Sequence, residues 1–280
     1  MVQTLNIVWD INPTIIQYGT ISIRWYAIFF ALAFIIGLFI VQKIFNHEKL
    51  DDSWADIYLV YIFIGTLIGA RLGHVFFYDW SFYSIHPGEI YKIWRGGLAS
   101  HGAAIGIIIA SWIFSKQFKL RSFLWIIDRL TPAAACGALL IRLGNLMNSE
   151  IIGKFAEVPW AFIFTRVDNI PRHPTQVYEC LTYFFIAILL LTIYFIYGNK
   201  KNEGLLSGLF FFTVFLSRFL IEFVKESQHI SIGFLQFNVG QLLSIPFIIL
   251  GIYLISISIR KELFAVFCSF KSRFNFYEQS

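Results

Sequence analysis

The chain has 280 residues, of which 58% are hydrophobic and only 14% are charged, and its mean hydropathy is +0.68. These values exclude an ordinary soluble domain and indicate a chain that resides in a lipid bilayer. A crossing helix needs about 20 largely apolar residues, so the length accommodates about seven crossings and no large soluble domain. The net charge of +5 comes from basic residues in short loops, which favours membrane lipid over nucleic acid as a partner.

The apolar segments predict an all-α bundle of about seven transmembrane helices. They lie near residues 22–45, 56–77, 98–115, 122–148, 176–197, 205–225 and 237–259. If the helices alternate in direction, the flanking Lys and Arg residues fall on one side of the membrane, which the positive-inside rule makes cytoplasmic. We therefore expect the N-terminus outside and a single transmembrane domain over residues 1–260. A basic, Phe-rich cytoplasmic tail is expected over residues 261–280.

Ionisable residues interrupt several of these apolar segments, although a charge at the bilayer centre costs at least about 2.5 kcal/mol on insertion scales. Arg71 lies in the second segment, His101 opens the third, and Asp128 lies in the fourth. Such residues usually face the bundle interior and mark a functional site. Two alternatives remain open, because Arg71 can extend to the interface and His101 can be a hydrogen-bonded core histidine.

The densest group of polar residues closes the fourth predicted helix. Arg142, Asn145 and Asn148 recur there at intervals of three residues. This spacing puts their side chains on one helical face, where guanidinium and amide donors converge. Extension of these side chains to the membrane interface is the alternative interpretation.

A second group lies in the sixth predicted helix, where Arg218 and Glu222 are four residues apart and can pair along the helix. Arginine suits a phosphate because it can donate two parallel hydrogen bonds to it. Together with Arg71 and Arg142, Arg218 supplies more positive charge than Asp128 and Glu222 obviously balance. The arginines therefore predict an anionic ligand.

The residues stand in a pattern that resembles the prolipoprotein diacylglyceryl transferase family over roughly residues 15–226. The strongest match is the string from Arg142 to Gly153, which carries Arg, Asn, Asn, Glu and Gly at the spacings of the family signature. Further matches follow in the family's order: Arg24-Trp25-Tyr26, Gly69 to Gly73, Gly96-Gly97, His101-Gly102, Asp128 with Pro132, Pro159-Trp160, Arg172 to Glu179, and Arg218 to Phe223. Departures occur at Ile141, Leu146 and Val214, where the family usually has Gly, Phe and Tyr.

The resemblance implies transfer of the diacylglyceryl group of phosphatidylglycerol to the lipobox cysteine thiol of a prolipoprotein signal peptide, with release of glycerol phosphate. It implies a bacterial inner-membrane enzyme with its active site toward the outer leaflet, and it requires no metal or cofactor. A transporter or channel for a small anion is the alternative, because a membrane cluster of Arg, Asn and Glu can also bind and release a ligand.

Under this resemblance, Arg142 and Arg218 hold the phosphate and stabilise the charge that grows on the leaving group. A free thiol has a pKa of about 8.5, so it needs a base or a nearby cation, and His101 is the favoured base. Tyr26 donates a hydrogen bond to the lipid head group. The residues expected to bind or orient substrate are Arg71, Asn145, Asn148, Glu150, Gly153, His173, Gln176 and Glu222. His173 lies in a loop and can equally hold a structural turn.

Overall fold

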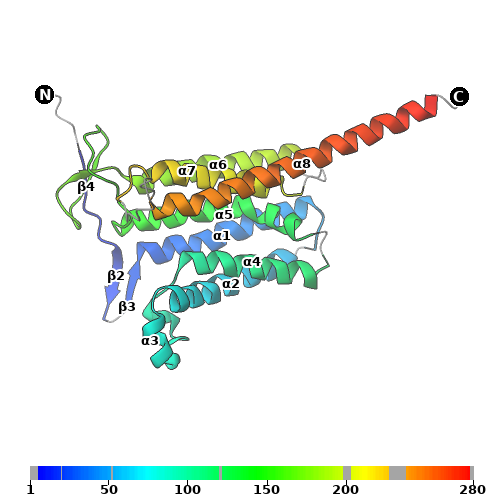
Figure 1. The fold of residues 1–280 in the computed structure, drawn as a ribbon. Helices are drawn as coiled ribbons and strands as arrows, with labels where there is room; N and C mark the ends of the chain where they lie inside the picture. Colours follow the sequence, from blue (N-terminus) through cyan, green and yellow to red (C-terminus); the bar gives the residue numbers. More distant parts are fainter. Residues whose placement is uncertain are drawn as a thin grey trace. The chain divides into compact units, whose positions relative to one another are not determined.

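The computed structural model describes residues 6–19, 21–51, 53–119, 122–197, 203–226 and 238–277, with the side chains of residues 21, 197 and 262–277 left out. Within these ranges the protein is mostly helical (Figure 1). The α-helices are α1 (Trp25–His47), α2 (Ser53–Phe77), α3 (Trp80–Ile85), α4 (Ser100–Gln117), α5 (Phe123–Met147), α6 (Thr175–Tyr197), α7 (Leu205–Ile221) and α8 (Val239–Tyr277). Two 3-10 turns, Pro87–Glu89 and Ile93–Arg95, lie between α3 and α4.

Five of these helices, α1, α2, α5, α6 and α8, are long and apolar enough to cross a membrane. This finding confirms the prediction of a multi-pass membrane protein. Each of the seven predicted segments contains a helix, but α7 has only 17 residues, and α4, with 18 residues, is not among the five. The count of seven crossings therefore stays a prediction.

Short strands accompany the helices, and the prediction of an all-α fold did not include them. Strand β1 (Ile7–Trp9) pairs in parallel with β4 (Phe162–Phe164), which pairs antiparallel with β5 (Pro171–Arg172). Strands β2 (Thr14–Tyr18) and β3 (Ile21–Arg24) form a hairpin. Strands of two to five residues are too short to show the apolar alternation that identifies a strand in a sequence.

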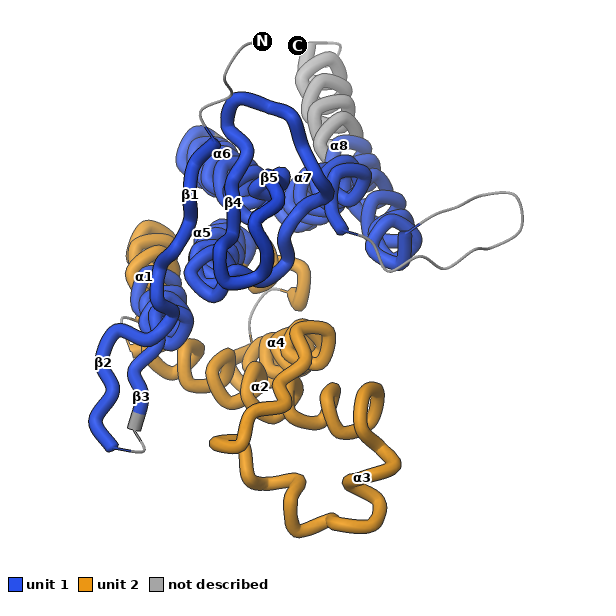
Figure 2. The backbone as a smooth tube through the Cα atoms, turned by 90° about the vertical axis from the view of Figure 1, so that its left-hand side faces the viewer, with its two compact units in different colours: residues 1–37, 131–280 blue, residues 38–130 orange. Residues whose placement is uncertain are grey.

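The chain divides into two compact units (Figure 2). Unit 1 comprises residues 1–37 and 131–280, and unit 2 comprises residues 38–130. In unit 1, α7 packs against both α6 and α8. Gly208 and Gly251 allow the close approach of α7 and α8, since a Cβ atom added at Gly251 would lie 2.5 Å from the backbone nitrogen of Phe212. Beyond its membrane-length part, α8 continues to Tyr277, so most of the predicted tail is helical.

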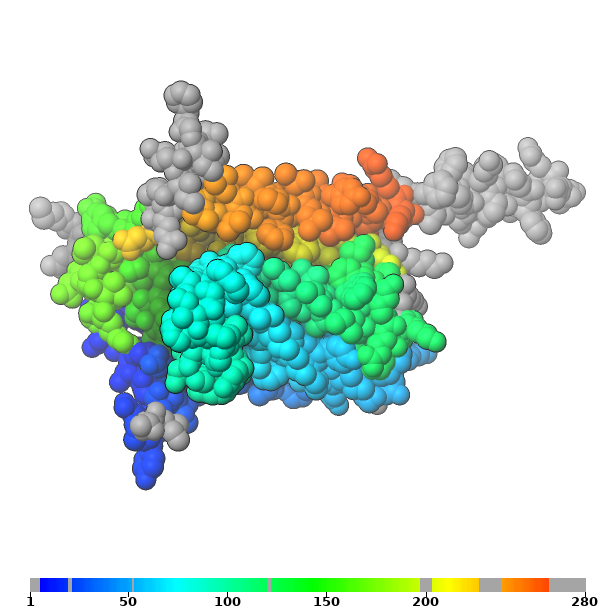
Figure 3. Space-filling view, turned by 60° about the horizontal axis from the view of Figure 1, so that its bottom comes forward, coloured from blue at the N-terminus to red at the C-terminus, as the bar shows by residue number. Residues whose placement is uncertain are grey.

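In unit 2, α2 and α4 lie along each other, and both are visible in the space-filling view (Figure 3). Glycines form the contact between them. A Cβ atom added at Gly69 would lie 2.3 Å from the carbonyl oxygen of Gly102, and one added at Gly106 would lie 1.9 Å from that of Gly65. Small residues at four-residue spacing let two membrane helices approach until their backbones touch. The glycines therefore fix the α2–α4 pair.

Candidate active site

The end of α5 carries a chain of side-chain hydrogen bonds. The Arg142 Nη1 donates to Asn145 Oδ1 at 3.2 Å, and Asn145 Nδ2 donates to Glu150 Oε2 at 3.3 Å. Asn148 Nδ2 donates to the other carboxylate oxygen of Glu150 at 3.2 Å. The prediction that these residues share one face is confirmed for Arg142 and Asn145, and Glu150 joins them from the loop. The two amides thus hold the carboxylate and orient the guanidinium group.

The backbone around Glu150 adopts an unusual conformation. Ser149 and Ile151 have φ angles of 55° and 59°, in the left-handed region that a β-branched residue rarely occupies. The beginning of α6 holds this turn, because Thr175 Oγ1 donates to the carbonyl oxygen of Ile151 at 2.6 Å and the Gln176 side-chain amide donates to that of Glu150. Gln176, predicted to bind or orient substrate, contacts backbone here. Strained backbone of this kind persists only where its surroundings fix it, as they do at functional sites.

A buried carboxylate on α6 pairs with Arg142. The Arg142 Nε lies 2.9 Å from Glu179 Oε2, and the Glu179 side chain is only 1% exposed. The hydroxyl group of Tyr183, one turn further along α6, lies beside the Arg142 guanidinium group. Neither Glu179 nor Tyr183 is among the site residues predicted from the sequence. An acidic residue inside the predicted segment 176–197 was the available signal for Glu179, whereas nothing in the sequence pointed to Tyr183.

Lys225, just after α7, connects two carboxylates. Its Nζ lies 3.8 Å from Glu179 Oε1 and 3.7 Å from Glu222 Oε2. Burial lowers the pKa of the Lys225 ammonium group, and the two carboxylates oppose that shift. Glu222 lies against Gly240 of α8, where an added Cβ atom would be 2.6 Å from its carboxylate. The prediction that Glu222 pairs with Arg218 is wrong, because the carboxylate of Glu222, the C-cap residue of α7, forms its ion pair with Lys225.

Arg218 differs from the other cations of this cluster. Among the residues that the structure describes, none forms a hydrogen bond or ion pair with its guanidinium group. Its charge and that of Arg142 both act on Tyr183, so the two arginines share one neighbourhood. The charged members of the cluster are Arg142, Arg218, Lys225, Glu150, Glu179 and Glu222. Because three cations meet three carboxylates, it is not an excess of charge that favours an anionic ligand but the Arg218 donors, which no described residue accepts.

Tyr26, in the first turn of α1, lies over the same part of α5. Its ring packs on Gly144, where an added Cβ atom would be 2.7 Å from Tyr26 Cδ2. The charges of Glu150 and Arg142 both act on the tyrosine hydroxyl group. The structure therefore brings together Tyr26, Arg142 and Glu150, as the resemblance implied. Gly144, which has no side chain, leaves room for the Tyr26 ring.

Gly153 connects three segments around the cluster. Its backbone N–H donates to the carbonyl oxygen of His173 at 3.0 Å, and it forms an antiparallel bridge with Lys225. An added Cβ atom would lie 2.5 Å from that oxygen, so only glycine fits. The His173 Nδ1 is 3.0 Å from the hydroxyl oxygen of Tyr178, and burial lowers the pKa of the imidazole. These contacts favour the structural turn that was the alternative role for His173.

Arg71, in unit 2, uses its donors on backbone. Its Nη2 and Nε donate to the carbonyl oxygens of Glu89 at 2.6 Å and Ile90 at 2.7 Å. Its Nη1 donates to those of Gly96 at 2.5 Å and Gly97 at 3.2 Å. The side chain is buried and closes the loop between α3 and α4. These contacts favour a loop-holding role, while the predicted contact with substrate stays a prediction.

His101, also in unit 2, lies in the first turn of α4, and its side chain is exposed. The part of the chain that the structure describes offers its imidazole no hydrogen-bond partner. The ring is therefore available to a ligand, as a proton acceptor must be. Asp128, by contrast, is only 1% exposed, and the next residue, Arg129, forms a buried ion pair with Glu48 at 2.6 Å.

Comparison with known proteins agrees with the residue pattern. The sequence profile of the family described as prolipoprotein diacylglyceryl transferase matches residues 13–257. A Chloroherpeton thalassium protein named phosphatidylglycerol-prolipoprotein diacylglyceryl transferase is 48% identical over 255 residues, which cover 91% of this chain and 95% of the relative. Proteins of the same name from Tolumonas auensis and Porphyromonas gingivalis are each 44% identical, covering 91% and 89% of this chain and 98% and 93% of theirs. The chain belongs to the prolipoprotein diacylglyceryl transferase family.

Proposed function

We propose that the protein transfers the diacylglyceryl group of phosphatidylglycerol to the lipobox cysteine of prolipoproteins, forming a thioether and releasing glycerol phosphate. The observation that carries the proposal is that an oriented Arg142 lies in the same neighbourhood as an Arg218 whose guanidinium group has no partner among the described residues. The names of the relatives supply the two substrates. A transporter is not favoured, because the matching family consists of transferases.

The arginines act on the phosphate. The Arg218 guanidinium group and the remaining donors of Arg142 hold the phosphate oxygens, and Tyr26 donates a hydrogen bond to the head group. As the bond between the diacylglyceryl carbon and the phosphate oxygen breaks, negative charge grows on the departing glycerol phosphate. Fixed cations in a water-poor site stabilise this charge without reorganising. Glu179, Asn145 and Glu150 keep Arg142 in position.

The sulfur atom supplies the new bond. It attacks the diacylglyceryl carbon that carries the phosphate, a C–S bond forms, and the C–O bond breaks with its electron pair going to the phosphate oxygen. The thiol proton passes to His101, whose imidazole is exposed and is the proposed base. His101 then returns the proton to the solvent or to the product phosphate.

The proposed topology has seven crossing helices in a bacterial inner membrane, with α4 and α7 as the two shorter ones. At about 1.5 Å per residue, α4 and α7 are roughly 27 Å and 25 Å long, close to the thickness of a thin hydrocarbon core. Basic residues flank the ends that we assign to the cytoplasm, including Lys43, Lys116 and Arg260. The N-terminus and the Arg142 cluster then face the outer leaflet, and the C-terminus faces the cytoplasm.

The test is reconstitution of the purified protein in phosphatidylglycerol vesicles with a lipobox peptide. Mass spectrometry should detect the peptide with a thioether-linked diacylglyceryl group, together with released glycerol phosphate. A peptide with serine in place of the lipobox cysteine is the control and should remain unmodified. Recovery of unchanged phosphatidylglycerol and unmodified peptide would contradict the proposal, and full activity of Arg142→Ala would remove the phosphate-binding role.

A further inference from the structure

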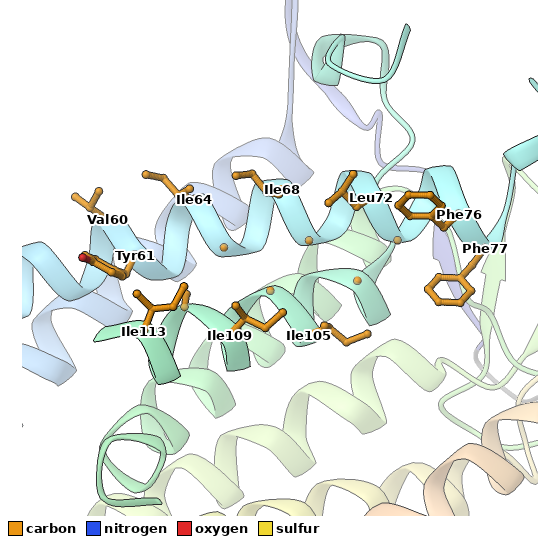
Figure 4. Close-up of a pocket in the computed structure, with 16 residues that line it drawn as sticks. Val60, Tyr61, Ile64, Ile68, Leu72, Phe76, Phe77, Ile105, Ile109 and Ile113 are labelled. Carbon is orange, nitrogen blue, oxygen red and sulfur yellow. The ribbon is translucent and has the colours of Figure 1, made fainter. Parts of the chain in front are cut away.

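An apolar groove runs between α2 and α4 on the surface of unit 2 (Figure 4). Its volume is about 680 Å³, and its lining is almost wholly apolar. The walls are formed by isoleucine and leucine side chains from both helices, including Ile64, Ile68, Leu72, Ile105, Ile109 and Ile113. Ile68 and Ile109 are 55% and 52% exposed, so these side chains lie on the surface of unit 2.

The floor of the α2–α4 groove is made of glycine. Gly65, Gly69 and Gly73 of α2 meet Gly102 and Gly106 of α4, and all five line the groove. Because these residues have no side chains, the floor is smooth and the isoleucines on either side stand up as two ridges. Ridges separated by a groove are the surface against which a further helix packs.

The length of the groove selects its occupant. The α2 lining extends from Val60 to Phe77, which corresponds to roughly 25 Å at the α-helical rise of about 1.5 Å per residue. A lipid acyl chain occupies one leaflet, about half of a hydrocarbon core that is about 30 Å thick. The apolar core of a signal peptide has about 7–15 residues, which span roughly 10–22 Å as a helix. The α2–α4 groove matches the helix rather than the acyl chain.

One end of the groove lies next to the proposed base. Gly102 lines the groove and directly follows His101, whose imidazole is exposed. In a signal peptide the processing region comes after the apolar core. A signal-peptide helix that lies parallel to α2 therefore ends at Gly102 and presents the residues that follow it to His101.

We propose that the α2–α4 groove binds the apolar core of the prolipoprotein signal peptide and delivers its lipobox cysteine to His101. This inference rests on the proposed function and adds the binding surface of the protein substrate. The groove has no charged residue in its lining, as the apolar core requires. The groove then recognises the peptide by shape and apolar contact, while thiol attack depends on His101 at the end of the groove.

Photo-crosslinking gives the direct test. A benzoylphenylalanine is introduced at position 68 or 109, and the protein is illuminated in phosphatidylglycerol vesicles with the lipobox peptide. The same probe at position 188 of α6, where Ile188 is 45% exposed, is the matched control. We expect a crosslinked peptide from positions 68 and 109 and none above background from position 188.

Kinetics give the second test. In the double variant Ile68→Trp, Ile109→Trp the added rings fill the groove. KM for the peptide should therefore rise about tenfold, because the peptide loses part of its apolar contact with the groove. KM for phosphatidylglycerol should stay at the wild-type value, and Ile188→Trp should change neither constant. These values are compared at equal amounts of folded protein.

Four outcomes overturn the inference: crosslinks to phospholipid alone, crosslinks between two copies of the protein, a raised KM for phosphatidylglycerol instead of the peptide, and unchanged KM values for both substrates. Each of them is counted only when the wild-type protein modifies the peptide, so the proposed function survives. If the wild type modifies no peptide, the proposed function itself fails. Activity of the wild type thus separates the two failures.

Discussion

The two units use arginine in contrasting ways. In unit 2, Arg71 donates to four backbone carbonyl oxygens and is only 4% exposed. In unit 1, Arg218 has no hydrogen-bond or ion-pair partner within the described residues, and Arg142 interacts with the side chains of Asn145 and Glu179. An arginine in a membrane helix is therefore not by itself a ligand site. What distinguishes the two cases is whether the donors are already used by the fold.

The largest effect should come from Arg218. Arg218→Ala should lower kcat/KM for phosphatidylglycerol by about 10²–10³, as removal of a preorganised donor to a developing charge does. Arg218→Lys should recover part of the activity, because it keeps the charge but loses the two parallel donors. Both are measured as diacylglyceryl transfer in vesicles. Activity near the wild-type level in Arg218→Ala would mean that the available donors do not contact the phosphate.

Arg71 should affect stability more than chemistry. Arg71→Ala leaves several carbonyl oxygens without donors and should lower the free energy of unfolding by about 3 kcal/mol. Thermal unfolding in detergent and protease cleavage of the loop at residues 89–97 would measure the change. Arg71→Lys should not restore stability, since one ammonium group cannot reach the same oxygens. Normal unfolding with a raised KM for phosphatidylglycerol would instead support direct substrate binding.

Separate substitutions of two glycines on α5 test how closely the Arg142 cluster is packed. Gly144→Ala should displace the Tyr26 ring, because the new Cβ atom would lie 2.7 Å from it, and should lower kcat/KM about tenfold through misplacement. Gly137→Ala is the matched control, since its Cβ atom would meet that of Ala33 at an ordinary 3.8 Å. Equal activity of the two variants would show that the position of Tyr26 does not matter.

The smallest effect concerns His173. Burial lowers its pKa, so below about pH 6.5 the unfolded chain takes up the proton first and the folded state loses stability. This contribution is present above the unfolded pKa and disappears as the pH falls through the folded one. His173→Gln should therefore flatten the pH dependence of thermal unfolding below about pH 6.5. If the pH dependence of thermal unfolding is unchanged in this variant, groups other than His173 cause it.

Much of the architecture followed from hydropathy. Each predicted apolar segment contains a helix, because about 20 apolar residues in lipid can satisfy their backbone only as a helix. The motif from Arg142 to Gly153 also identified the cluster, since helical spacing places Arg142 and Asn145 on one face. These predictions depend on local sequence and needed no knowledge of distant contacts.

The remaining features depend on contacts between distant segments. The pairing of Glu222 with Lys225, only three residues away, is the exception, and it was missed because the apolar pattern extended the helix to residue 225 whereas α7 ends at Ile221. Tyr183 belongs to the cluster because α6 packs beside α7, and the acceptors of Arg71 lie 18 to 26 residues away. Neither the position of Tyr183 nor the acceptors of Arg71 can be predicted from the spacing of residues along the sequence.

The parallel pairing of β1 with β4 has a consequence for the order of folding. Ile7 pairs with Phe162, and Trp9 Nε1 donates to the carbonyl oxygen of Leu146 at the end of α5. Contacts between residues this far apart form late, because the chain between them must first be synthesised and inserted. Residues 7–9 thus reach their final positions only after α5 and β4 have formed. The Arg142 cluster is completed only after most of the helices are already in the membrane.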